Sequence, residues 1–268
     1  MGATSLLSRL SAALSGVRAA APAAGTRPTL ALPDRDQVLY VIGDIHGCLR
    51  QLEALESLIV ERASHIADRE HVIVLVGDLV DRGPQSASVI DRAMAPLGGN
   101  VRRIVLAGNH EEAMLDSIES ATAAADWLSF GGHETLKSYG ADEIPRVDSR
   151  AGFRKFQRMM EFLVPPEHIE WLRALPKAVR WRDYFITHAG VRPGLDLDEQ
   201  SQRDLQWIRE PFLSSDEDFG AVVVHGHTPS ETPMRFANRI SVDTGCFMGG
   251  RLSAAMLDRD SVGFLSVS

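Results

Sequence analysis

The stretch VLYVIGDIHG, residues 38–47, joins a short apolar run to a polar segment that begins at Gly43. Residues 38–42 are β-branched, aromatic or otherwise apolar, which is typical of a buried strand. Gly43 and Gly47 let the backbone turn sharply and bring Asp44 and His46 to the end of that strand. The stretch therefore predicts a strand whose carboxyl end carries side chains capable of chemistry.

The same arrangement recurs twice in the next part of the chain. Apolar runs at 72–76 and 103–107 are followed by GDLVDRG, residues 77–83, and GNHE, residues 108–111. Segments 49–62, 85–95 and 110–120 have the apolar spacing of amphipathic helices. The alternation of strand and helix predicts a parallel sheet with right-handed crossovers.

The second half of the chain is richer in strands. Runs at 178–181 and 184–187 predict a hairpin, and further strands are expected at 221–224, 240–243, 252–257 and 262–267, mainly antiparallel. The middle segment, 121–175, is mostly helical and is expected to be an insertion that rims the site. The predicted fold is α/β: a layered α/β/β/α sandwich of two mixed sheets flanked by helices.

Charge and composition exclude several classes of protein. The chain has 268 residues, with 28 basic and 36 acidic side chains and a formal net charge of −8. An acidic chain argues against a nucleic-acid-coating protein. No apolar run approaches the ~20 residues of a membrane span. The two cysteines, Cys48 and Cys246, are too few for a disulfide framework; we interpret them as small buried residues.

Residues 1–33 differ from the rest of the chain. They contain three arginines and no acidic residue, and Arg9 and Arg18 interrupt the apolar stretch that a secretion signal needs. We expect a flexible N-terminal tail at 1–33, a single catalytic domain at 34–268 and a cytoplasmic location.

Five clusters of glycine, histidine and carboxylate or amide side chains follow predicted strands. Ligand sites in α/β proteins gather beyond the carboxyl ends of strands, and these side chains suit hard or borderline metal ions. The donors exceed what one catalytic ion needs, which indicates two ions sharing a carboxylate. The candidate ligands are Asp44, His46, Asp78, Asn109, His188 and either His225 or His227.

The remaining histidines carry weaker signals. Spacing alone does not distinguish His225 from His227, because residues two apart on an extended segment share a face. His65, His71 and His168 lie in charged contexts and are expected on the surface. His133 follows two glycines and is left open.

The ordered set GDIHG, GDLVDRG, GNHE, HAG and HGHT resembles the PPP-type metallophosphoesterases of the calcineurin-like superfamily, in particular their bacterial and phage serine/threonine phosphatases. The resemblance spans residues 38–268 and includes Trp127…Gly131-Gly132-His133-Glu134-Thr135, Trp207-Ile208-Arg209 and Asp243-Thr244-Gly245. It implies two metal ions, expected to be manganese with iron as the other option. It selects His227 over His225, and makes Asp78 the bridging ligand. It implies that Arg82, Arg209 and Asn109 bind the substrate phosphate.

A metal-activated water would attack phosphorus directly, and the leaving oxygen would need a proton. His110 is the expected general acid, with Asp81 as its carboxylate partner. These features predict a phosphomonoester hydrolase acting on phosphorylated serine or threonine of proteins. The alternative is a symmetrical dinucleoside tetraphosphate hydrolase, whose second motif typically has Ala where this chain has Asp81. Neither nucleic acid nor membrane is an expected partner, and the oligomeric state is left open.

Overall fold

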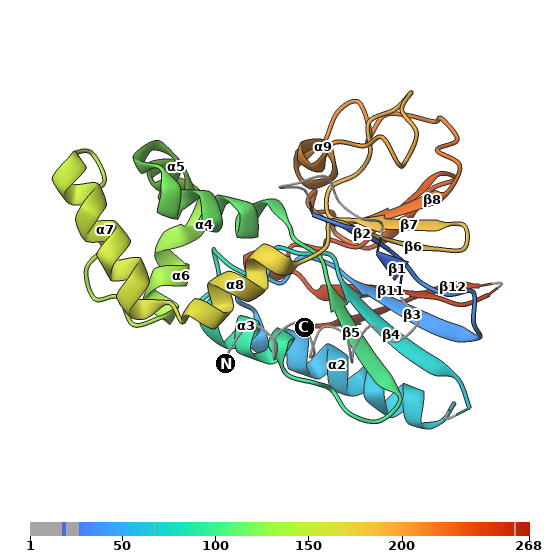
Figure 1. The fold of residues 1–268 in the computed structure, drawn as a ribbon. Coiled ribbons are helices and arrows are strands. Elements are labelled where there is room, and N and C mark those ends of the chain that lie inside the picture. Colours follow the sequence, from blue (N-terminus) through green and yellow to red (C-terminus); the bar gives the residue numbers. More distant parts are fainter. Residues whose placement is uncertain (1–17, 20–26, 67, 260) are drawn as a thin grey trace.

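The computed structural model describes residues 18–19, 27–66, 68–259 and 261–268. Two β-sheets pack face to face, and helices cover their outer faces (Figure 1). This is the layered α/β sandwich of two mixed sheets that the sequence predicts. No helix in the described part of the chain is long and apolar enough to cross a membrane.

The first sheet has five strands in the order β12-β11-β3-β4-β5. Its parallel half is built from β3 (Gln37–Ile42), β4 (Glu70–Leu75) and β5 (Val101–Val105). The crossovers contain α2 (Leu49–Ser64) and α3 (Ser86–Met94). All six residues of β3 are buried, as expected for a central strand covered on both faces.

The antiparallel half of this sheet differs from the sequence prediction. β11 (Leu252–Leu257) pairs with β3, and β12 (Val262–Val267) pairs with β11. The pattern of the second half of the chain predicts both strands in a mainly antiparallel second sheet. A strand's hydrophobic pattern reports its burial but not which edge it joins, and the edge of β3 was open to pairing.

The second sheet has seven strands in the order β1-β2-β6-β7-β8-β10-β9. Only the β1–β2, β6–β7 and β9–β10 pairs are antiparallel, so the sheet is mixed rather than mainly antiparallel. Its strands are β1 (Arg18–Ala19), β2 (Thr29–Ala31), β6 (Ala178–Trp181), β7 (Tyr184–Thr187), β8 (Val222–His225), β9 (Met234–Arg235) and β10 (Arg239–Ser241).

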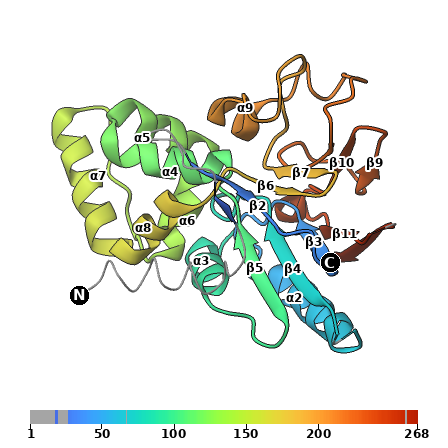
Figure 2. The ribbon, with the colours of Figure 1, turned by 45° about the vertical axis from the view of Figure 1, so that its right-hand side comes forward.

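Alternation along the strands separates the core into layers. In β3, Leu39 and Val41 face the second sheet, where they meet Ile186 and Val224. Tyr40 and its alternate neighbours face the helices on the other side. A third apolar cluster lies on the outer face of the second sheet, under α9 (Gln202–Trp207). Figure 2 shows the same layers from a second direction.

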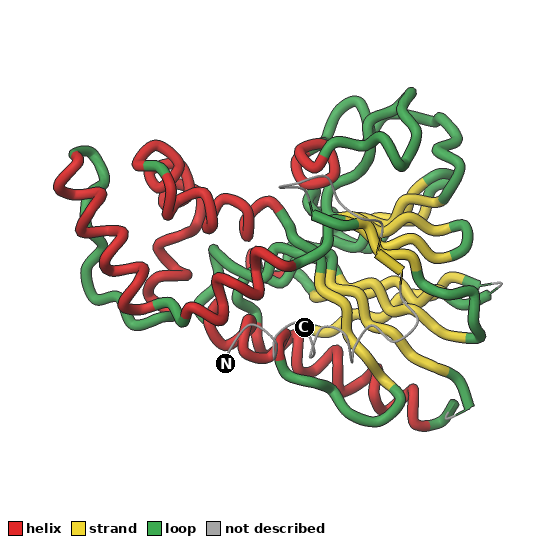
Figure 3. Tube along the Cα trace, viewed as in Figure 1, coloured by secondary structure: helices red, strands yellow, loops and turns green. Residues whose placement is uncertain are grey.

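Residues 109–174 form a helical region beside the sandwich (Figure 3). Its helices are α4 (Asn109–Glu119), α5 (Ala121–Trp127), the π-helix η1 (Leu128–Gly132), α6 (His133–Ser138), α7 (Arg150–Leu163) and α8 (Pro166–Ala174). A short 3-10 helix, η2 (Cys246–Met248), lies in the loop before β11. The break expected at Gly131-Gly132 is a kink inside η1, where Phe130 and Gly131 have non-helical backbone angles.

The expected tail requires a correction. Residues 1–17 and 20–26 lie outside the described part of the chain, but β2 pairs in parallel with β6 inside the second sheet. Leu30 and Leu32 are buried between the sheets. The apolar run 30–32 therefore supplies a strand, and the fold includes residues on the N-terminal side of the expected boundary at residue 34.

Candidate metal centre

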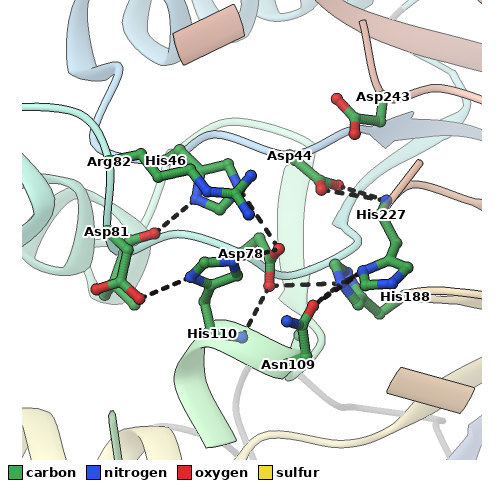
Figure 4. Close-up of polar contacts among 12 residues, drawn as sticks. Asp44, His46, Asp78, Asp81, Arg82, Asn109, His110, His188, His227 and Asp243 are labelled. Carbon is green, nitrogen blue, oxygen red and sulfur yellow. Dashed lines mark hydrogen bonds and ion pairs between the residues drawn. The ribbon is translucent and has the colours of Figure 1, made fainter. Parts of the chain in front are cut away.

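The predicted ligands come together where strands of both sheets end. Asp44 and His46 follow β3, Asp78 follows β4, and Asn109 begins α4 after β5. From the second sheet, His188 follows β7 and His227 lies just beyond β8. All six side chains are buried, and Figure 4 shows them converging.

Asp78 lies between two groups of possible ligands. One group is His46, Asp78 and His110, and the other is Asp78, His188 and His227; within each, the ligand atoms lie within 4.8 Å of one another. Asp78 Oδ2 is 3.4 Å from His46 Nε2, and Asp78 Oδ1 is 3.4 Å from His188 Nε2. A carboxylate with one oxygen toward each group has the geometry of a bridging ligand.

Hydrogen bonds fix which nitrogen of His188 is free to bind a metal. His188 Nδ1 lies 3.1 Å from the carbonyl oxygen of Val76, so in the neutral ring Nδ1 carries the proton. Its Nε2 lone pair then points at Asn109 Oδ1, 2.8 Å away, and at His227 Nδ1, 3.2 Å away. A cation between these nitrogen and oxygen atoms would satisfy them together, so the donor set fits a metal ion.

The other group is arranged by the same principle. His46 Nδ1 lies 2.7 Å from the carbonyl oxygen of Val80, which leaves Nε2 to face Asp78. Arg82 Nη1 lies 3.0 Å from that Nε2. Asp44 is outside both groups of ligand atoms, but it accepts the backbone N–H of His227 on both oxygens at 3.1 Å. Asp44 therefore lies beside the centre, tied to the loop from the other sheet.

Two glycines leave room for these carboxylates. A Cβ at Gly108 would overlap Asp78 Oδ1, and a Cβ at Gly226 would overlap Asp44 Oδ1. The motifs Gly108-Asn109-His110 and His225-Gly226-His227 therefore need glycine, because the backbone itself packs against the ligands.

The backbone of the centre is held in an uncommon conformation. Among the described residues other than glycine, a positive φ occurs at His46, Asp78, Asp81, Arg82, Arg182 and His227. All but Arg182 belong to the site. Such conformations cost free energy and persist only where the surroundings enforce them. Here Glu111 contributes: its carboxylate accepts the N–H groups of Asp78 and Leu79 at 2.8 and 2.7 Å.

Asp81 and His110 form the expected pair. Asp81 Oδ2 lies 2.6 Å from His110 Nδ1, both side chains are buried, and His110 Nε2 is 3.8 Å from Asp78 Oδ2 (Figure 4). His110 therefore presents Nε2 toward the metal groups while its other nitrogen faces a carboxylate.

Burial is the largest cause of the pKa shifts of the carboxyl and imidazole groups in the site. Desolvation, followed by the charges of neighbouring carboxylates, raises the pKa of Asp44 and of Asp78 well above their usual range. Burial lowers the pKa of His46 and His188, and burial with Arg209 lowers the pKa of His227 to about 3. Without metal, burial thus favours the neutral forms of both the carboxyl groups and the imidazole rings.

This arrangement matches a known family. Residues 38–262 match the family model for calcineurin-like phosphoesterases. The chain belongs to the calcineurin-like phosphoesterase family. As a calcineurin-like phosphoesterase it is a hydrolase, and the family's dinuclear metal site corresponds to the clustered Asp and His side chains.

Relatives within the family carry two kinds of name. The chain is 28% identical over 224 residues to serine/threonine-protein phosphatase 1 of Salmonella typhimurium, covering 82% of this chain and 91% of the relative. It is 26% identical over 233 residues to an asymmetrical bis(5'-nucleosyl)-tetraphosphatase of Anoxybacillus flavithermus, covering 80% and 88%. A crystal structure of a candidate diadenosine tetraphosphatase shares the fold, with a TM-score of 0.62 at 22% identity over 90% of this chain and 99% of the other.

The two predicted phosphate-binding arginines both lie near the centre. Arg82 is exposed, and its guanidinium lies 4.6 Å from the centre of the Phe247 ring. Arg209 is also exposed, and its charge acts on His227 and Asp243. This calcineurin-like phosphoesterase therefore places the predicted site residues near one another, with Asp44 beside the two groups of ligand atoms rather than within them.

Some predictions outside the centre need correction. His71 and His168 are buried rather than solvated. His71 Nε2 lies 3.1 Å from the carbonyl oxygen of Ile66, and His168 lies between Tyr139 and Asp91. Charged sequence neighbours indicate an exposed position, but these rings satisfy their nitrogens with hydrogen-bond partners inside the fold. His133 is exposed, its Nδ1 2.8 Å from the carbonyl oxygen of Leu128.

Several residues that surround the candidate ligands could not be given a role from the sequence. Trp127 and Thr135 contact Asp81, Glu111 holds the Asp78 loop, and Asp243 hydrogen-bonds with Asp44. In the sequence, these residues could have been noticed through their positions inside the motifs that resemble the family.

The thiols of Cys48 and Cys246 contact each other. Cys246 is buried and Cys48 is half-buried, in partial agreement with the prediction that both are small buried residues.

Proposed function

We propose that this chain is a serine/threonine protein phosphatase that hydrolyses phosphomonoesters at a two-metal centre. The proposal rests above all on the 2.6 Å contact between Asp81 and His110 beside the candidate metal ligands. An aliphatic alkoxide is a poor leaving group, so a positioned proton donor accelerates its departure substantially. An ionised Asp81 favours the doubly protonated His110 that can act as this donor.

The candidate ligands are Asp44, His46, Asp78, Asn109, His188 and His227, with Asp78 shared. When bound there, a metal pair supplies an activated water and positive charge for displacement at phosphorus. We propose that Arg82 and Arg209, with the amide of Asn109, bind the non-bridging phosphate oxygens, since a guanidinium makes paired hydrogen bonds to phosphate. His110 Nε2 then gives its proton to the leaving oxygen as the P–O bond breaks. Manganese is the proposed ion, with iron as the other option.

A dinucleoside tetraphosphate hydrolase is the second candidate function. Aromatic side chains next to the centre favour it: the Phe130 and Trp207 rings lie 6.5 Å apart, centre to centre, and Trp207 is 41% exposed. Phe247 packs on His46 with ring centres 4.9 Å apart. Exposed aromatic rings beside a phosphate site can stack on nucleobases. The relatives named as asymmetrical tetraphosphatases also support it.

A substrate panel distinguishes the two. The purified chain is loaded with Mn²⁺ and tested on phosphoserine and phosphothreonine peptides, a phosphotyrosine peptide, symmetric and asymmetric cleavage of a dinucleoside tetraphosphate, and p-nitrophenyl phosphate. We expect the highest kcat/KM among the biological substrates on phosphoserine or phosphothreonine. A higher value on the dinucleotide would overturn the proposal in favour of the second function. Metal analysis of the same sample identifies the ions.

A further inference from the structure

Two side chains besides His110 donate hydrogen bonds to the Asp81 carboxylate. Trp127 Nε1 donates to both carboxylate oxygens, at 3.0 and 2.9 Å, and Thr135 Oγ1 donates to Oδ1 at 2.6 Å. Asp81, Trp127 and Thr135 are each completely buried. With His110, three residues therefore surround one carboxylate, and no solvent competes for it.

Thr135 also fixes the backbone of Asp81. The backbone N–H of Asp81 donates to Thr135 Oγ1 at 2.8 Å, while that hydroxyl donates back to the side chain. Asp81 has φ 72°, in the left-handed region that a residue with a Cβ seldom occupies. The Asp81 N–H also donates to Ser86 Oγ at 3.1 Å. The Thr135 hydroxyl thus contacts both the main chain and the carboxylate of Asp81, and Ser86 shares the main-chain contact.

The segment that carries these donors is shaped around Asp81. Trp127 ends α5 and Thr135 lies in α6, with the π-helix η1 between them. A Cβ on Gly131 would lie 2.9 Å from Asp81 Cβ, and one on Gly132 would lie 2.6 Å from the Trp127 ring. Inside η1 the backbone leaves the helical conformation at Phe130 (φ −117°, ψ 17°) and Gly131 (φ 138°, ψ −4°), so the chain kinks there. This kink and the two glycines let the segment approach this closely.

We propose that Trp127 and Thr135 are positioning residues that orient Asp81 toward His110, and through it set the protonation of the leaving group. The inference rests on the proposed phosphoester hydrolysis. In the step concerned, the P–O bond breaks and the leaving oxygen takes the proton from His110 Nε2, while Nδ1 stays bonded to Asp81. If Asp81 rotates away, His110 loses the 2.6 Å contact that orients its ring.

Electrostatics supports the same role. Burial raises the pKa of Asp81 to about 7, and the hydrogen bonds from Thr135 and Trp127 oppose that rise. Hydrogen bonds to the ionised form stabilise it. Without these donors, a smaller fraction of Asp81 would be ionised at neutral pH, and His110 would lose its anionic partner.

The test compares two leaving groups in four variants: Trp127→Phe, Thr135→Val, Thr135→Ser and Asp81→Asn. The substrates are an alkyl phosphate, whose leaving oxygen needs a proton, and p-nitrophenyl phosphate, whose leaving group needs little help. We expect Trp127→Phe and Thr135→Val to lower kcat on the alkyl phosphate about tenfold or more, and on p-nitrophenyl phosphate by less than about threefold. Thr135→Ser keeps the hydroxyl and restores the alkyl rate.

Trp181→Phe is the matched control, because Trp181 is also a buried tryptophan but lies on β6 of the second sheet. This variant should leave the ratio of the alkyl phosphate rate to the p-nitrophenyl phosphate rate unchanged. Equal losses on both substrates, or no loss, in Thr135→Val would overturn the inference. If Trp127→Phe fails to fold, the Thr135 pair still decides it. If Asp81→Asn also shows no dependence on leaving group, the proposed mechanism fails with it. A dependence in Asp81→Asn alone overturns only the positioning role.

Discussion

Asp78 is the residue on which both halves of the centre depend. Its two carboxylate oxygens face different histidines, His46 and His188, each at 3.4 Å. His188, by contrast, belongs to only one of the two groups of ligand atoms. The loss of these two side chains should therefore have different effects on metal content.

We expect Asp78→Asn to lose most of both ions, and His188→Asn to retain about one per chain. Activity should fall at least about a hundredfold in both, because the reaction needs the pair. Metal analysis after gel filtration measures the content. Asp91→Asn is the control, since Asp91 is 71% exposed and pairs with His168 outside the centre. Two retained ions in Asp78→Asn would show that Asp78 does not bridge.

Metal binding should release protons from the carboxylates rather than from the histidines. Burial raises the pKa of Asp44 and Asp78 in the metal-free chain, while burial keeps His46 and His188 neutral. A ligand must be deprotonated to bind, so affinity should rise with pH. Calorimetric titration with Mn²⁺ in buffers of different ionisation heat counts the protons. Affinity that stays constant from mildly acidic to mildly alkaline pH would contradict this expectation.

The carboxylate and imidazole side chains that could bind a metal were the predictable part of the site. Asp44 and His46 could be proposed as ligands because the chemistry limits which residue types can serve and the strand end gives their place. Trp127 could not, because an indole N–H that serves one carboxylate looks in the sequence like any core tryptophan. Its role depends on a contact with Asp81 across 46 positions of the chain.

Among the elements, the π-helix η1 is the one whose shape matters most for the site. Gly131 has φ 138° and lies against Asp81 and Arg82, and its carbonyl oxygen accepts the backbone N–H of Arg82 at 3.3 Å. Gly140, at the end of α6, also has a positive φ of 93°, but a Cβ there would meet nothing within 4 Å. A comparison of alanine substitutions at these two glycines therefore distinguishes the cost of backbone strain from the cost of close contact.

Gly140→Ala should cost about 1 kcal/mol of unfolding free energy from its backbone conformation alone. Gly131→Ala should cost about 1–3 kcal/mol more, because the added methyl group overlaps Asp81 and Arg82. It should also lower kcat on alkyl phosphates about tenfold by displacing Asp81. Urea denaturation and steady-state rates measure both effects. Equal behaviour of the two variants would show that η1 does not shape the site.

Element prediction succeeded where the pattern was local. The hairpin of β6 and β7 has the bounds that the sequence indicated, 178–181 and 184–187. The assignment of β11 and β12 to a sheet failed, because the choice of a partner edge depends on what the other strands leave open. The π-helix could be anticipated only as a break at Gly131-Gly132.

At the scale of the whole molecule, Arg27 joins the N-terminal segment to the helical region. Its Nη1 donates to the carbonyl oxygens of Leu172, Arg173 and Leu175 at 2.7–3.1 Å, at the end of α8. Its Nε donates to Glu112 on α4 at 3.1 Å. A cation at a helix carboxyl end also interacts favourably with the helix dipole. Through these hydrogen bonds, Arg27 connects the segment before β2 to α8 and α4.

Arg27→Ala should lower the unfolding free energy by about 2–3 kcal/mol, since it leaves buried carbonyl groups without a charged donor. Arg154→Ala, at an exposed position on α7, should change it by less than about 0.5 kcal/mol. Thermal and urea unfolding measure the difference, and kcat should be unchanged in both variants. A neutral effect of Arg27→Ala would show that residues around β2 contribute little to stability.

The candidate metal ligands come from opposite halves of the sandwich. Asp78 and Asn109 follow strands of the first sheet, whereas His188 and His227 follow strands of the second. An ion held between them acts as a removable cross-link that closes the chain between positions 109 and 188, and it favours the folded state by mass action. We therefore expect metal starvation to shorten the lifetime of this protein in a cell, so that supply of the ion sets how much enzyme survives as well as how fast each molecule works.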